Sequence, residues 1–161
     1  MSILTIVEHP SDILEQKCEP VTEFGDELHQ LLDDMYETMI KADGVGLAAP
    51  QIGICKQIAV IEIDEEDGRL ELINPKIFKQ SGEQIDIEGC LSFPGLFGTV
   101  SRFHTVTVKA MDRSGREFTL IAEDYLARVI QHEIDHLEGV LFTSKVIEYV
   151  DEEDLESSEE E

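Results

Sequence analysis

The segment His132-Glu133-Ile134-Asp135-His136 constrains this chain more than any other feature, because its two histidines are four residues apart. Residues four apart lie on the same face of an α-helix, so both imidazoles can reach one metal ion. Val129 and Tyr125 lie one and two turns before Glu133 on the same stripe of the helix, which predicts that this face points inward. Apolar residues at helical spacing and a terminal glycine predict a helix over residues 124–138: Leu126, Val129, Ile130, Ile134, Leu137 and Gly139.

Glu133 follows the first histidine and can reach a water molecule at the metal without itself binding the ion. A hydrolytic metal usually has three protein ligands and one open position. The two histidines of the helix supply only two of these ligands. One subclass of metalloproteases places a third histidine where this chain has Phe142, and this subclass is therefore excluded. The pattern predicts a catalytic divalent-metal site in a metal-dependent hydrolase.

The third ligand must come from another part of the chain, and many histidines, cysteines and carboxylates are candidates. Cys90 stands out within EGCLS, residues 88–92, because Gly89 lets the backbone approach closely. Cys18 and Cys55 lack such a setting and are expected to be small, partly buried thiols. The three cysteines form neither an even set nor a C-x-x-C pair, which argues against a disulfide framework and indicates a reducing compartment.

The remaining pattern indicates a mixed fold with few helices. Leucines and methionines recur on one face of residues 26–41, which predicts a second helix. The turns at 65–68 and 112–115 each join two strand-like segments and so predict antiparallel hairpins. Residues 44–53 are expected to form a loop, and residues 141–146 a strand. We therefore expect a single α+β domain in which antiparallel β-sheets pack around a central metal-binding helix.

The chain has 161 residues and a formal net charge of −24, to which residues 148–161 contribute nine acidic side chains and no Lys or Arg. We expect a catalytic domain of residues 1–147 and a flexible acidic tail of residues 148–161. An acidic surface repels phosphate backbones and anionic lipids, so neither direct DNA binding nor membrane docking is expected. The amino terminus lacks the features of a signal peptide, which predicts a cytoplasmic protein.

Three separated segments together resemble the signature of the peptide deformylase family: GVGLAAPQ at 44–51, EGCLS at 88–92 and QHEIDH at 131–136. The resemblance runs from the first residues to about Val146. It implies a hydrolase that removes the N-formyl group from the N-terminal formylmethionine of newly synthesised polypeptides and releases formate.

The resemblance also implies the missing metal ligand, because Cys90 matches the family's metal-binding cysteine and completes a set with His132 and His136. Glu133 matches the catalytic glutamate. A thiolate and two imidazoles suit Zn²⁺, Fe²⁺, Ni²⁺ or Co²⁺. The resemblance places Fe²⁺ first as the ion used in the cell.

Two further residues match the family's donors to the substrate oxygen, namely the side chain of Gln51 and the backbone N–H of Leu91. Fixed donors of this kind stabilise the oxyanion that develops when the formyl carbon becomes tetrahedral. The glycine-rich segment is expected to lie along an extended peptide, and the metal helix to form one wall of the methionine pocket. The expected substrate-binding residues are Gly44, Val45, Gly46 and Val129.

The expected partners are N-formylmethionyl nascent peptides and, in transient encounters, the ribosome. A basic C-terminal helix has been linked to ribosome docking in this family, and the acidic tail of this chain argues against docking through it. A monomer is expected. Two alternatives stay open: a metallopeptidase that cleaves internal peptide bonds, and a non-enzymatic module in which protein ligands fill all four coordination positions.

Overall fold

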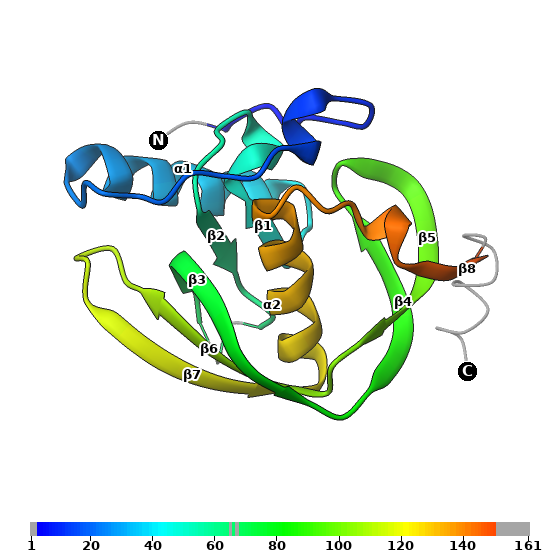
Figure 1. Ribbon diagram of the computed structural model, residues 1–161. Helices are drawn as coiled ribbons and strands as arrows, with labels where there is room; N and C mark the ends of the chain where they lie inside the picture. Colours follow the sequence, from blue (N-terminus) through cyan, green and yellow to red (C-terminus); the bar gives the residue numbers. More distant parts are fainter. Residues whose placement is uncertain (1–2, 65, 67, 151–161) are drawn as a thin grey trace.

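The computed structural model describes residues 3–64, 66 and 68–150, which form two α-helices and two antiparallel sheets (Figure 1). The helices are α1, Asp26–Lys41, and α2, Asp124–Leu137. The five-stranded sheet has the order β1-β2-β3-β6-β7, with bounds Gly46–Ala48, Ile58–Ile61, Leu70–Ser81, Thr105–Met111 and Glu117–Glu123. The three-stranded sheet has the order β4-β5-β8, with bounds Gln84–Cys90, Phe93–Arg102 and Val146–Val150. Three short 3-10 helices are η1, Asp12–Glu15, η2, Ala49–Ile52, and η3, Phe142–Ser144.

Helix α2 lies between the two sheets, as Figure 1 shows, and its apolar residues join the largest core cluster. Val129, Ile130 and Ile134 pack there with buried residues of β2, β3, β6 and β7. Ten of its fourteen residues are buried, including both histidines. Removal of this much apolar surface from water holds the helix, and therefore its polar side chains, in a fixed position. The predicted α+β fold with a central helix is confirmed.

Helix α1 covers the other face of β1, β2 and β3 and has the bounds that the sequence predicts. Leu32, Met35 and Met39 on its inner face are fully buried. They pack against Leu47 of β1 and Val60 of β2. This second core fixes the glycine-rich segment that precedes η2, on the side away from α2.

Two local predictions are wrong. Residues 44–53 contain β1 and η2 instead of a loop, because Gly46, Leu47 and Ala48 pair in register with β2. Residues 141–146 are not a strand, since η3 occupies their centre and β8 begins only at Val146. Short apolar runs do not distinguish a strand from a helical turn by periodicity alone.

The predicted hairpins are confirmed: β2 pairs antiparallel with β3, and β6 with β7. The predicted tail begins inside β8, because Glu148, Tyr149 and Val150 pair with β5. Residues 148–150 are therefore part of the three-stranded sheet. The rest of that predicted tail, residues 151–161, lies outside the described residues.

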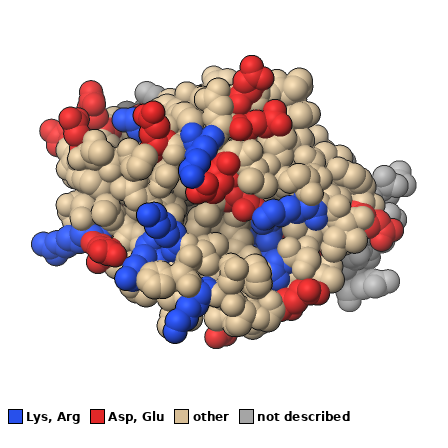
Figure 2. Space-filling model, in the orientation of Figure 1, with Lys and Arg blue, Asp and Glu red and all other residues tan. Residues whose placement is uncertain are grey.

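The charge on the described surface is mixed in sign. Figure 2 shows Lys and Arg side chains among Asp and Glu on the face in view, despite the net charge of −24. In the part of the chain that the structure describes, neither helix has the length and apolar character needed to cross a membrane.

Candidate metal centre

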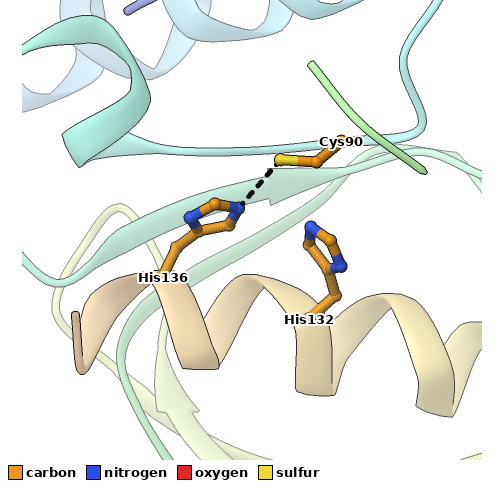
Figure 3. Close-up of side chains that lie close together, drawn as sticks. All are labelled: Cys90, His132 and His136. Atoms are coloured by element: carbon orange, nitrogen blue, oxygen red, sulfur yellow. Dashed lines mark hydrogen bonds between the residues drawn. The ribbon is translucent and has the colours of Figure 1, made fainter. Parts of the chain in front are cut away.

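Three side chains that could hold a metal ion meet where the end of β4 approaches α2 (Figure 3). His132 and His136 project from successive turns of α2, and Cys90 comes from the last position of β4. One potential ligand atom from each residue lies within 4.8 Å of the other two. Sγ of Cys90 is 3.3 Å from Nε2 of His136. No other group of this kind occurs among the described residues.

A buried carboxylate orients the first histidine. Oε1 of Glu88 lies 2.8 Å from Nδ1 of His132, which leaves Nε2 of that ring available for a metal. Nε and one terminal nitrogen of Arg102 each donate to Glu88 at 2.8 Å, and Arg128 donates to it at 2.5 Å. Arg102 also donates to Asp135 at 2.5 Å. The charges beside His132 therefore form a connected network with opposite signs in contact.

Burial and this network shift the pKa values of neighbouring groups in different directions. Burial opposes ionisation of Glu88, but hydrogen bonds from Arg102 and His132 lower its pKa far below the usual range. Burial also opposes the charged form of His132, but hydrogen bonds with Cys90 and Glu88 raise its pKa to about 10. Burial and the charge of His132 lower the pKa of His136 well below its usual value. A metal ion would compete with the proton for Nε2 of His132, so its binding would release that proton.

Glu133 has no such partners, although only 4% of the residue is exposed. Its Oε1 is buried without a hydrogen-bond partner among the described residues. Burial is the largest cause that raises the pKa of this carboxyl group to about 7. The backbone of Gly46 lies so close that a Cβ there would collide with Oε2 of Glu133. The carboxyl group is thus buried, unpaired at one oxygen and held against a glycine.

The side-chain amide of Gln51 is oriented by the turn that contains it. Its Oε1 accepts a hydrogen bond from the backbone N–H of Ala48 at 2.9 Å. Nε2 therefore points the other way, 3.2 Å from Oγ of Ser92 and 3.6 Å from Sγ of Cys90. Only 1% of Gln51 is exposed. The structure presents the donor end of the amide to the cysteine.

A cavity of about 450 Å³ opens beside these groups. His136 does not line it, whereas the other nine residues predicted for the site do: Gly44, Val45, Gly46, Gln51, Cys90, Leu91, Val129, His132 and Glu133. Tyr125 also lines the cavity but is 48% exposed, so the prediction that it faces inward with Val129 is wrong. The cavity has the size of typical small-ligand sites.

The sequence pattern did not reveal the charged network, although its members stand in informative places along the chain. Glu88 opens the EGCLS segment, and Arg128 interrupts an apolar helix face one turn before His132. A charged residue at a buried position requires a partner, which is the signal that could have found both. It also missed cavity walls such as Ile87, Leu96 and Phe97.

The other three histidines make contacts away from the potential metal ligands Cys90, His132 and His136. The ring of His9 stacks on Phe93, Nε2 of His29 is 2.8 Å from the carbonyl oxygen of Arg113, and His104 pairs with Asp124. The position of the excluded third histidine holds a core aromatic, because Phe142 is 1% exposed and packs beside the ring of His132.

A thiol and two imidazoles beside a buried carboxyl group and an oriented amide are the components of a hydrolytic metal centre. The fold and the site thus define the class of metal-dependent hydrolases.

Comparison with known proteins identifies the family within this class. The family model described as polypeptide deformylase matches residues 3–152. Peptide deformylase 1 of Bacillus cereus is 56% identical over 156 residues, which cover 97% of this chain and 100% of the relative. Peptide deformylase 1 of Bacillus subtilis is 54% identical over 159 residues, or 99% of each chain. The chain belongs to the polypeptide deformylase family, and it is an enzyme of that kind, as its sequence predicts.

Solved structures agree with this assignment. A peptide deformylase from Legionella pneumophila superposes with a TM-score of 0.87 at 43% identity, covering 90% of this chain and 86% of the other. One from Synechococcus elongatus, solved in complex with actinonin, gives a TM-score of 0.86 at 46% identity, covering 89% and 80%.

Proposed function

We propose that this enzyme removes the N-formyl group from the N-terminal formylmethionine of newly synthesised polypeptides, which releases formate and a free amino terminus. Family membership and the names of the relatives support this reaction. The observation that carries the proposal is the buried carboxyl group of Glu133, unpaired at Oε1, beside three potential metal ligands and a cavity. A hydrolase needs a group of this kind to move a proton at the reacting bond.

Cys90, His132 and His136 would hold the metal. Their donor atoms are close enough to converge on one ion, and the contact between His132 and Glu88 leaves the free ring nitrogen as the ligand atom. Such an ion supplies Lewis-acid chemistry when bound, because it polarises a carbonyl group and lowers the pKa of water to roughly 7. The donor set suits Fe²⁺, Zn²⁺, Ni²⁺ or Co²⁺. We propose Fe²⁺ as the ion in the cell.

Glu133 would transfer the protons of the reaction. As a carboxylate it accepts a proton from the attacking water, and it later gives this proton to the amine that leaves as the C–N bond breaks. The free Oε1 is available for this exchange because no side chain or backbone group of the described residues occupies it. One water is consumed, and one formate and one free amine are produced.

Gln51 and Leu91 would stabilise the negative charge that develops on the formyl oxygen. The amide of Gln51 already points its donor end toward Cys90, and the contact with Ala48 fixes that orientation. The backbone N–H of Leu91 follows Cys90 directly and supplies the second donor. Donors fixed before the reaction stabilise the transition state more than the substrate.

The substrate would lie in the cavity with its backbone along Gly44, Val45 and Gly46. Gly44 and Gly46 keep this path open, since a Cβ on either would collide with Leu91 or Glu133. Val129, 5% exposed, would form a wall of the pocket for the methionine side chain. The methionine side chain is apolar, and so are most of the side chains that line the cavity.

Formate release measured with two substrates tests the function. The metal-loaded enzyme should release formate from a formyl-Met peptide and leave both its internal peptide bonds and a general protease substrate intact. Actinonin, the ligand of the Synechococcus elongatus relative, should inhibit the release. Peptide fragments without formate would contradict deformylation and support a metallopeptidase. Cytoplasmic location, a monomeric state and a transient encounter with the ribosome stay predictions.

A further inference from the structure

Two cysteines outside the proposed site lie on neighbouring, parallel pieces of chain. Glu19 forms a parallel bridge with Lys56. The backbone N–H of Glu19 donates to the carbonyl oxygen of Cys55 at 3.2 Å, and that of Gln57 donates to the carbonyl oxygen of Glu19 at 2.9 Å. This register places Cys18, the residue before Glu19, beside Cys55, the residue before Lys56.

The geometry of the pair fits a disulfide. Neighbouring strands are about 4.8 Å apart, and bridged cysteines have Cα atoms roughly 4.4–6.8 Å apart. Both side chains also point to the same side, because they share one apolar cluster with Ala48 and Leu137. The thiol of Cys55 donates to the carbonyl oxygen of Lys17, the residue next to Cys18, at 3.5 Å. Neither thiol lines the active-site cavity.

The two thiols differ in access to solvent. Cys18 is 3% exposed, whereas Cys55 is only partly buried. Burial, followed by the hydrogen bond with Cys55, raises the pKa of Cys18 to about 12. A reagent in solution can therefore meet Cys55 first, and Cys18 is placed to react with a sulfur already attached to Cys55.

We propose that Cys18 and Cys55 form a dithiol that a low-molecular-weight disulfide, such as glutathione disulfide, oxidises to an intramolecular disulfide. The thiolate of Cys55 attacks glutathione disulfide, forms a mixed disulfide and releases one glutathione. Cys18 then attacks the sulfur of Cys55, its S–H proton passes to the departing glutathione sulfur, and the second glutathione is released as a thiol. Two protein thiols are oxidised, and one glutathione disulfide is reduced to two glutathione molecules.

The disulfide would join parts of the chain that surround the site. It would enclose the 36 residues between Cys18 and Cys55, which include α1 and the segment that carries Gln51. The backbone N–H of Cys18 also donates to the carbonyl oxygen of Leu137 at 2.8 Å, next to His136 on α2. Because a cross-link restricts the unfolded chain, the oxidised enzyme should melt roughly 5–10 °C higher than the reduced enzyme.

The test is to incubate the metal-loaded enzyme with glutathione disulfide, alkylate the remaining thiols and map the peptides by mass spectrometry without reduction. In the wild type, the peptides of Cys18 and Cys55 should be linked. In Cys18→Ser, glutathione should remain attached to Cys55. In Cys55→Ser, Cys18 should carry no glutathione because it is buried.

The wild-type map decides the matter without any substitution that could disturb folding. Cys18 and Cys55 both recovered as alkylated thiols, or Cys55 linked to Cys90, would overturn the proposal. Glutathione that stays on Cys55 of the wild-type enzyme would overturn it as well, since Cys18 would then be unable to reach that sulfur.

Discussion

The carboxyl groups of Glu88 and Glu133 are both buried beside His132, but they differ in their hydrogen-bond partners. Glu88 accepts hydrogen bonds from Arg102, Arg128 and His132, so its charge is fully paired. Glu133 is equally buried, but its Oε1 has no partner among the described residues. Their pKa values accordingly move in opposite directions, down for Glu88 and up to about 7 for Glu133.

The difference separates a group that positions from a group that reacts. A buried carboxylate with both oxygens paired stays in one protonation state and holds its neighbours in place. An unsatisfied buried polar atom costs about 1–3 kcal/mol of stability, and such a cost is tolerated where the atom takes part in chemistry. This contrast supports the proposal that Glu88 orients His132 and that Glu133 transfers the proton.

Substitution of the reactive carboxyl group should have the largest effect. Glu133→Gln keeps the shape of the side chain but cannot accept the proton, so kcat for formate release should fall by roughly 10²- to 10⁴-fold. Glu138→Gln, at the exposed end of the same helix, is the matched control and should retain full activity. A Glu133→Gln enzyme with near wild-type kcat would remove this residue from the proton path.

Loss of the Gln51 side-chain amide should have the second largest effect on kcat. Gln51→Ala removes the proposed donor to the formyl oxygen, and kcat should fall by about 10²- to 10³-fold with a smaller change in KM. Gln30→Ala, an exposed glutamine on α1 that bonds to Asp34, serves as control. An increase in KM alone would show that Gln51 binds substrate and transition state equally.

Substitution of the positioning carboxylate should change metal binding and stability more than chemistry. Glu88→Gln leaves buried Arg128 without its counter-charge and leaves Arg102 with Asp135 alone, which should lower the free energy of unfolding by about 3–5 kcal/mol. Metal affinity should fall roughly 10- to 100-fold because His132 loses its orienting partner. Asp86→Asn, at an exposed position of β4, is the control, and both quantities are measured by chemical denaturation and metal titration. Unchanged metal affinity would contradict the assignment.

Substitution of Gly46, which lies close to Glu133, should have the smallest effect on kcat. A methyl group in Gly46→Ala would push the carboxyl group from its position, and kcat should fall by about tenfold. Gly25→Ala adds a methyl group where no atom lies within 4 Å and should leave kcat unchanged. Equal activity in both variants would show that the place of Glu133 is not critical.

The sequence predicted the central helix because its pattern is local: apolar spacing, a terminal glycine and two histidines four residues apart. The EGCLS setting made Cys90 a candidate, the resemblance identified it as the third ligand and supplied Gln51, and the structure brings both toward His132 and His136. That convergence depends on the pairing of β4 with β5 and on the packing of η2, which are contacts between distant segments.

The sequence places Glu88 and Arg128 where a charged residue needs a partner, but no local pattern tells which of the 36 acidic residues faces which buried arginine. Local propensity also failed at residues 44–53. Gly46, Leu47 and Ala48 have little preference for a strand, and tertiary pairing with β2 imposes one.

Turnover per bound metal ion, measured for Glu133→Gln and Glu88→Gln side by side, tests the central claim most directly. Formate release from a formyl-Met peptide and metal content are determined on the same samples. Glu133→Gln should keep its metal and lose turnover per ion by roughly 10²- to 10⁴-fold, whereas Glu88→Gln should lose metal and keep most of its turnover per remaining ion. The reverse pattern, with metal lost from Glu133→Gln and turnover per ion lost from Glu88→Gln, would contradict the account.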